Sequence, residues 1–267
     1  MRTRIPTSTD SSVISPPLRG WTVISLRERS QQGAAKRAIE AAGARALALP
    51  GLRLEPLQAG AALEQALARR PTIALCISPA AVRFLLQLDP RIATRVAIGA
   101  GVGAGTAAAL RRAGFAEVLA PIEQSPQISE GLLAHPRLAQ GAGETVLLVA
   151  APGGRGVLAP ELRARGFAVE EVQVYRRGPA RLDARHARAV LTAGAPLGLL
   201  LSSAEALDNV LGQLPAEAVA RLKRARVAAS SERLIEHARL RGFGDIVAAA
   251  GPQPQALVSA LAASATR

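Results

Sequence analysis

The chain has 267 residues, enough for one large or two ordinary domains, and 49% of them are apolar, enough for a packed core. Its 33 Lys and Arg residues outnumber 20 Asp and Glu residues, a net charge of +13 that favours an anionic partner. The same Arg- and Ala-rich composition also arises in GC-rich genomes. The single cysteine, Cys76, excludes an internal disulfide, and three scattered histidines argue against a metal site, so we expect a reducing, cytoplasmic protein.

The predicted elements begin after residues 1–20, which are rich in Ser, Thr and Pro, lack a signal peptide's apolar stretch and are predicted to be a disordered tail. No apolar run reaches the roughly 18 residues of a membrane helix. Strands are predicted at 22–26, 44–49, 72–77, 95–99, 116–120, 145–150, 167–175, 197–202, 226–230 and 245–250. Helices are predicted at 31–42, 80–88, 106–113, 157–165, 204–213, 232–241 and 254–263. This alternation predicts βαβ units with buried parallel sheets.

An internal repeat runs through these elements. TVISL at 22–26 returns as TVLLV at 145–149, and LCISPAAVRFLL at 75–86 returns as LLSSAEALDNVL at 200–211. RVAIG…RRAGFAEVLA likewise returns as RVAAS…RLRGFGDIVA. Matches in the same order indicate a duplicated five-stranded α/β unit, each copy resembling a flavodoxin-like doubly wound sheet. The repeat alone would place the domain boundary near residues 141–143.

Hydroxyl residues follow several of the predicted strands. Ser78, Ser203 and Ser231 lie at strand ends, and Thr106 opens a helix after a glycine-rich turn. Ligands of doubly wound sheets bind beyond the carboxyl ends of the strands, which makes these residues candidates for ligand binding. Helix capping is the more common role for any single one of these positions, because Ser and Thr accept hydrogen bonds from the first N–H groups of a helix. Both roles can coexist, since helix starts also attract carboxylates.

Two glycine-rich segments resemble nucleotide loops without meeting their requirements. GAGVGAGT at 99–106 lacks the third glycine of GxGxxG, and PGGRGVL at 152–158 lacks the Lys-Ser/Thr of a P-loop. The second could form an anion-binding turn around Arg155, or an ordinary turn with a solvated arginine. Arg27, just after the first strand, is a further candidate for substrate contact, with a solvated surface arginine as the alternative.

Tyr175 is the only tyrosine and ends the strand predicted at 167–175. Such a phenol often packs against a helix with its hydroxyl on a backbone carbonyl. Here the strand is long for a sheet interior, and Arg176-Arg177-Gly178-Pro179 after it is typical of a domain-crossing linker. We therefore interpret Tyr175 as facing an anionic substrate.

Four stretches together resemble the uroporphyrinogen-III synthase family, over about residues 21–263. They are LLVAAPGGRGVLAPELRARGFAVEEVQVYRR, CISPAAVRF, VAIGAGVGAGTAAALRRAGF and LLLSSAEALDNVL. The resemblance implies an α/β fold with two flavodoxin-like domains, each a doubly wound parallel sheet, joined by a two-stranded linker. One domain would comprise residues 21–50 plus 178–267 and the other 56–168, with linker strands at 51–55 and 169–177.

The resemblance also implies an activity: cyclisation of hydroxymethylbilane to uroporphyrinogen III, with loss of water and inversion of ring D through a spiro intermediate in the inter-domain cleft. The substrate carries eight carboxylates, which suits the basic chain, and no cofactor is needed. Tyr175 is the candidate general acid at the mouth of the cleft, helped by Arg176 or Arg177, which favour the phenolate.

The remaining candidates bind substrate: Arg27, Ser78, Thr106, Arg155, Ser203 and Ser231. ASSERLIEHA departs from the family's usual glycine-threonine turn, so no threonine role is carried over there. We expect a monomer that contacts hydroxymethylbilane synthase transiently, without nucleic acid or membrane partners.

Three other functions stay open at this point. A non-catalytic two-domain protein could bind small anions, and an enzyme could use GAGVGAGT to hold a nucleotide. The positive charge alone would suit a nucleic-acid binder, although no basic patch interleaved with aromatics stands out.

Overall fold

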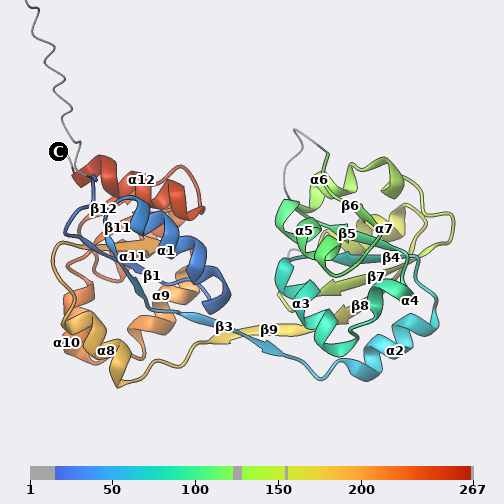
Figure 1. Ribbon diagram of the computed structural model, residues 1–267, viewed down its shortest axis with the longest axis horizontal. Coiled ribbons are helices and arrows are strands. Elements are labelled where there is room, and N and C mark those ends of the chain that lie inside the picture. The colour runs from blue at the N-terminus through green and yellow to red at the C-terminus, as the bar shows by residue number, and fades with distance from the viewer. Residues whose placement is uncertain (1–15, 123–127, 154–155, 266–267) are drawn as a thin grey trace, which may run out of the picture. The chain divides into compact units, whose positions relative to one another are not determined.

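The computed structural model describes residues 16–122, 128–153 and 156–265 (Figure 1). The described chain forms two compact units. Unit 1 contains the described residues up to Arg53 together with those from Pro179 onward, and unit 2 contains Leu54–Gly178. Each unit holds one five-stranded parallel sheet, as the sequence predicts.

Unit 1 is built on a sheet in which strand β10 separates β1 from β11. Its strands are β1 (Thr22–Ser25), β2 (Arg45–Ala48), β10 (Leu197–Leu201), β11 (Arg226–Ala229) and β12 (Ile246–Ala248), in the spatial order β12-β11-β10-β1-β2. Its helices are η1 (Arg29–Gln31), α1 (Gln32–Ala41), α8 (Ala184–Leu191), α9 (Ala204–Leu211), α10 (Ala216–Leu222), α11 (Glu232–Leu240) and α12 (Pro254–Ala265). Alternate strand residues face opposite layers: Leu200 packs with α1 and α12, and Leu199 packs with α8 to α11.

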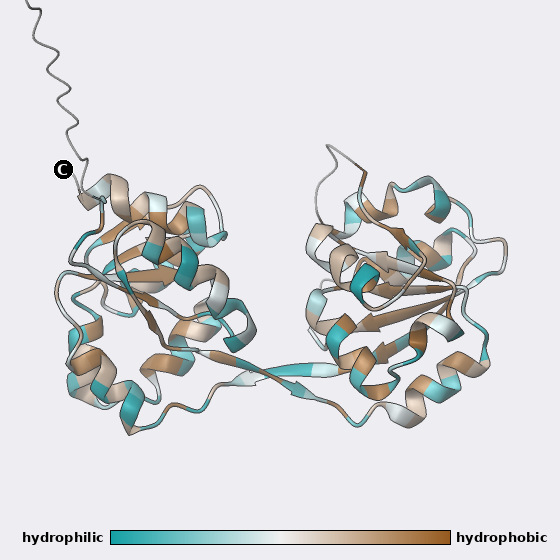
Figure 2. Cartoon of the chain, viewed as in Figure 1, coloured by the Kyte–Doolittle hydropathy of each residue, from teal (hydrophilic) through white to brown (hydrophobic). Residues whose placement is uncertain are grey.

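Unit 2 repeats this plan. Its strands are β4 (Ile73–Cys76), β5 (Ile98–Gly101), β6 (Glu117–Leu119), β7 (Thr145–Ala150) and β8 (Ala168–Gln173), in the spatial order β6-β5-β4-β7-β8. Its helices are α2 (Gly60–Ala68), α3 (Pro79–Leu88), α4 (Ile92–Arg95), α5 (Ala104–Arg112), α6 (Ser129–Leu133), η2 (Pro136–Leu138) and α7 (Leu158–Ala164). Within each unit the central strands are predominantly hydrophobic, whereas the helices around them mix hydrophobic and polar residues (Figure 2).

The internal repeat of the sequence accounts for both strand orders. In the repeat, β1 is equivalent to β7, β10 to β4, β11 to β5 and β12 to β6. With these equivalences, the spatial order β2-β1-β10-β11-β12 of unit 1 corresponds to β8-β7-β4-β5-β6 in unit 2, so the two orders are the same. Both are the 2-1-3-4-5 order of a flavodoxin-like sheet. The chain enters unit 2 at the strand equivalent to the third strand of unit 1. The boundary near residues 141–143 suggested by the repeat therefore falls inside unit 2, in the turn before β7.

Two strands connect the units: β3 (Leu52–Pro56) and β9 (Tyr175–Pro179) form a separate two-stranded sheet. Leu57 N donates to Val174 O at one end and Ala180 N donates to Gly51 O at the other, a pairing that is antiparallel. Gly51 lies so close to α9 that a Cβ there would stand 2.1 Å from the carbonyl oxygen of Ala206. Only glycine fits at the start of this linker.

Several predicted element boundaries are wrong. The stretch predicted as one strand at 167–175 is two strands, because 168–173 pair with β7 and Tyr175 begins β9, so the linker strand is 175–179 rather than 169–177. The strand predicted at 95–99 is β5 at 98–101, since Arg95 belongs to α4. The tail predicted at 1–20 ends earlier than expected, because residues 17–20 form a turn with Leu18 fully buried under α1 and α12. Residues 1–15 lie outside the described part.

No helix within the described ranges is long and apolar enough to cross a membrane.

Candidate functional site

The carboxyl edge of the unit 1 sheet carries three of the predicted site residues. Arg27, Ser203 and Ser231 follow β1, β10 and β11, which are neighbours in the sheet. Ser203 is the N-cap of α9, and its hydroxyl accepts from the backbone N of Ala206 at 3.2 Å. Ser231 occupies the N-cap position of α11, but its exposed side chain makes no capping bond. The sheet therefore brings these residues to one edge.

Arg27 is held by its surroundings at this edge. Its Nη1 donates to Gln31 Oε1 at 3.0 Å, and Nη2 donates to the carbonyl of Pro252, ahead of α12. Its Nε is buried and has no hydrogen-bond partner among the described residues. Burial lowers the pKa of Arg27 below its ordinary value because desolvation penalises the charged form. The half-buried guanidinium is thus a cation with unused donor capacity.

The carboxyl edge of the unit 2 sheet carries Ser78 and Thr106, after the adjacent strands β4 and β5. Ser78 is the N-cap of α3, and its Oγ accepts from the backbone N of Ala81 at 3.1 Å. Thr106 does not open its helix as predicted, because Gly103 is the N-cap of α5 and Thr106 is buried in the first turn. The helix starts adjoin, since a Cβ on Gly105 would lie 3.7 Å from Pro79 Cγ.

Tyr175 joins this edge through its hydroxyl, which lies 3.0 Å from Ser78 Oγ. Its ring stacks on Phe84 of α3, with centroids 5.3 Å apart and planes 18° from parallel. The residue is only 2% exposed and belongs to a core cluster of unit 2. The sequence predicts that Tyr175 faces an anionic substrate. Within unit 2 its ring instead packs inward, and only its hydroxyl reaches the edge residue Ser78.

Arg176, next to Tyr175 in the sequence, does not share its environment. Side chains alternate along a strand, so Arg176 is exposed, and its Nε donates to Glu55 Oε2 at 2.8 Å on the paired strand β3. This ion pair belongs to the two-stranded linker. The structure therefore gives no support to the expected effect of Arg176 on the phenol.

Sequence reasoning identified Tyr175 and Ser78 separately but missed their hydrogen bond and the stacking on Phe84. The CISPAAVRF stretch holds both Ser78 and Phe84, six residues apart on α3 and its cap. Arg155, the remaining predicted site residue, lies outside the described residues. Among the residues that are described, no group of three or more His, Cys, Asp or Glu side chains is placed to hold a metal ion.

Taken together, two doubly wound parallel sheets with polar residues at their carboxyl edges define a tandem flavodoxin-like protein, a class that binds ligands at those edges. The family model described as Uroporphyrinogen-III synthase HemD matches residues 33–259. The chain belongs to the uroporphyrinogen-III synthase family.

Individual relatives agree with this assignment. The chain is 32% identical to uroporphyrinogen-III synthase of Salmonella typhimurium strain LT2 over 163 residues, 58% of this chain and 63% of that protein. It is 31% identical to the enzyme of the same name from Escherichia coli strain K12 over 173 residues, 64% of this chain and 68% of that protein. The match thus spans less than two thirds of the Salmonella protein. The fold of this chain is similar to that of uroporphyrinogen-III synthetase from Helicobacter pylori 26695, with a TM-score of 0.59 and 16% identity. The similarity covers 91% of this chain and 98% of the Helicobacter chain.

Proposed function

We propose that this protein is a uroporphyrinogen-III synthase, a cyclising lyase that converts hydroxymethylbilane to uroporphyrinogen III and water with inversion of ring D. Family membership carries the proposal, and the residues that the family motifs contribute at the sheet edges support it. Such an enzyme must hold a flexible chain with eight carboxylates so that its two ends meet. Holding reacting groups in place can supply about 7–11 kcal/mol of the barrier.

The two carboxyl edges offer groups suited to carboxylates. Helix N-termini follow β4, β5, β10 and β11, and a helix start attracts anions through its N–H groups and dipole. Arg27 adds a half-buried cation at the edge of the unit 1 sheet. We assign substrate binding to Arg27, Ser78, Thr106, Ser203 and Ser231. Arg155 keeps the same role as a prediction from its motif.

We infer that the hydroxyl pair Tyr175–Ser78 protonates the leaving hydroxyl. The phenol is too deeply buried to reach a substrate directly, whereas Ser78 is half-buried at the sheet edge. Tyr175 would donate to Ser78 Oγ, and the Ser78 hydroxyl would donate to the departing oxygen, which leaves as water. The ring D carbon that attacks first is fully substituted and carries no proton. The proton that balances the one delivered is lost from the unsubstituted carbon of the same ring when the final bond forms. Ser78 then touches the substrate, and Tyr175 acts through it.

The intermediate, the oligomeric state, the compartment and the partner enzyme are proposed from the resemblance to the family. The spiro intermediate would form without a cofactor, in a monomer located in the cytoplasm. Transient contact with hydroxymethylbilane synthase would deliver the unstable substrate.

Turnover distinguishes this proposal from a non-catalytic protein that binds small anions. Hydroxymethylbilane generated enzymatically is mixed with a hundredth of an equivalent of the protein, and its disappearance is followed against the spontaneous reaction. The synthase consumes many equivalents of substrate per protein and accelerates the loss. A binding protein sequesters at most one equivalent and leaves the spontaneous rate unchanged, a result that would overturn the proposal.

A further inference from the structure

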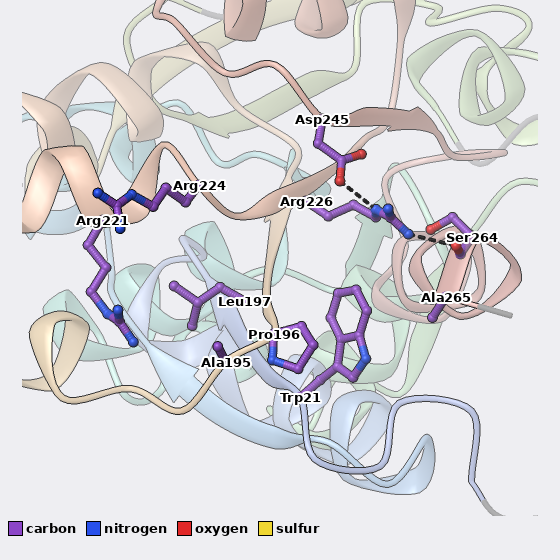
Figure 3. Close-up of a pocket in the computed structure, with 10 residues that line it drawn as sticks. All are labelled: Trp21, Ala195, Pro196, Leu197, Arg221, Arg224, Arg226, Asp245, Ser264 and Ala265. Carbon is purple, nitrogen blue, oxygen red and sulfur yellow. Dashed lines mark hydrogen bonds and ion pairs between the residues drawn. The ribbon is translucent and has the colours of Figure 1, made fainter. Parts of the chain in front are cut away.

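A second concave site lies in unit 1, away from the carboxyl edge. It is a cavity of about 490 Å³, lined by Trp21, Ala195, Pro196, Leu197, Arg221, Arg224, Arg226, Asp245, Ser264 and Ala265 (Figure 3). Trp21 and Asp245 precede strands β1 and β12, while Leu197 and Arg226 begin β10 and β11. The cavity is therefore at the amino edge of the sheet, the opposite edge from Arg27. Its volume falls within the roughly 300–1,000 Å³ of small-molecule sites.

The charges around this cavity do not cancel. Arg226 is neutralised and fixed, because its Nε donates to Asp245 Oδ2 at 2.8 Å and its Nη1 donates to Ser264 O at 2.6 Å. Among the described residues, Asp245 is the only acidic residue in the lining. Arg221 and Arg224 are therefore two lining cations that Asp245 does not neutralise.

Those two arginines differ in how they are held. The Arg221 guanidinium donates to the backbone carbonyls of Val190 and Ala193, at the end of α8, which fixes its position without neutralising its charge. Arg224 is exposed. In the part of the chain that the structure describes, no ion pair joins either arginine to a carboxylate. An anion entering the cavity would meet the Arg221 guanidinium, which backbone carbonyls hold in place, and the Arg224 guanidinium, which is exposed and can change its rotamer.

The opposite wall is flat and apolar. The indole of Trp21 and the ring of Pro196 lie next to each other in the cavity lining, with Leu197 nearby (Figure 3). The Arg226 guanidinium stands over the indole, 5.9 Å from the ring centre, so it helps to fix the orientation of Trp21. A planar ring is the shape that such a wall accommodates best.

We propose that this cavity binds a small planar aromatic carboxylate. Its ring lies against Trp21 and Pro196, and its carboxylate accepts hydrogen bonds from Arg224 and Arg221. The site is separate from the carboxyl-edge residues assigned to the cyclisation, and its occupancy does not depend on that activity.

The experiment uses the full chain and its only tryptophan. Because Trp21 is the sole tryptophan and lines the cavity, its fluorescence reports on ligand binding there. The wild-type protein is titrated with benzoate as the probe and, separately, with inorganic phosphate, an anion without a ring. Arg224→Gln removes the adjustable cation. Arg239→Gln is the matched control, because it removes the same charge from an exposed position on α11 outside the cavity.

We expect a saturable fluorescence change with benzoate that is about fivefold weaker in affinity in Arg224→Gln, as suits an exposed charge pair. Arg239→Gln should bind like the wild type, and phosphate should bind more weakly than benzoate. Calorimetry with Trp21→Leu, read without fluorescence, should show reduced benzoate affinity. The proposal is overturned if benzoate gives no saturable change, if phosphate binds as tightly, or if both arginine variants weaken binding equally.

Discussion

At the scale of single residues, the hydrogen bond between Tyr175 and Ser78 links the core of unit 2 to its carboxyl edge. The phenol ring contributes apolar packing against Phe84, while its hydroxyl is positioned by Ser78. Ser78 in turn caps α3. Core packing, helix capping and the proposed proton transfer therefore involve the same pair of side chains. This arrangement lets the packing and the chemistry of Tyr175 be separated by substitution.

Tyr175→Phe keeps the stacked ring and removes only the hydroxyl. We expect the free energy of unfolding to fall by about 0.5–1.5 kcal/mol, the contribution of one hydrogen bond. Turnover should fall by about 10²–10⁴-fold, because proton donation to the leaving hydroxyl is lost. Urea denaturation and single-turnover kinetics measure the two effects, and a wild-type rate would remove Tyr175 from the mechanism.

Ser78→Ala tests the relay, with Asp183→Ala, which removes the N-cap of α8 outside the proposed site, as its control. Both changes remove a side chain that caps a helix, at a cost of about 1 kcal/mol in stability, but only Ser78 contacts Tyr175. We expect Ser78→Ala to match the rate loss of Tyr175→Phe, and the double variant to be little slower than either single one, because the two residues act as a unit. Rate losses that multiply in the double variant would contradict the relay.

Cys76 should be unreactive while unit 2 is folded. It lies fully buried in β4, and this burial raises the pKa of its thiol to about 12, so almost no thiolate forms near neutral pH. We expect an aromatic disulfide reagent to modify no thiol in the native protein and one thiol per chain in denaturant. Rapid modification of the native protein would show that β4 is accessible.

At the scale of elements, a charged cluster connects two helices of unit 1. Asp208 on α9 accepts from Arg241 Nε at 2.7 Å, just after α11, and lies 2.9 Å from His237 Nε2 on that helix. The hydrogen bond from Arg241, followed by that from His237, holds the pKa of Asp208 below its usual value. A depressed folded-state pKa stabilises the protein above the unfolded value and loses that effect as the pH falls through the folded value.

Asp208→Asn should therefore lower the free energy of unfolding at pH 7, by no more than about 1 kcal/mol because the pair is partly solvated. The difference from the wild type should begin to shrink below about pH 4, where the carboxylate of the unfolded chain becomes protonated. It should shrink further as the pH falls through the lower folded-state pKa. Urea denaturation at pH 7 and pH 3 measures the difference in the free energy of unfolding between the variant and the wild type. Glu236→Gln, an exposed change on α11, should show no such trend, and a difference that grows in acid would refute the assignment.

The sequence predicted elements well where a pattern was repeated. Both sheets, and most of their strands, followed from the two copies of TVISL, LCIS and RVA. The features that the sequence patterns did not predict depend on tertiary contacts. The break between β8 and β9 is invisible in the alternation of 167–175, because it depends on where pairing with β7 ends. The inward rotation of Tyr175 depends on Phe84, a partner 91 residues earlier (175 − 84).

At the scale of the whole molecule, two units with the same strand order are joined by a linker of two paired strands. Each unit presents helix starts and hydroxyl side chains at one sheet edge, and the chain as a whole carries a net charge of +13. A net positive charge favours the approach of polyanions, and the proposed function uses each sheet edge as a binding surface. Cyclisation with ring inversion requires both ends of the substrate to be held.

The isomer composition of the product tests this account most directly. Hydroxymethylbilane is generated enzymatically in the presence of the protein, the products are oxidised, and the porphyrin isomers are separated by chromatography. Spontaneous ring closure gives the type I isomer, whereas we predict that the protein yields predominantly type III. A product that remains type I at every protein concentration would contradict the account.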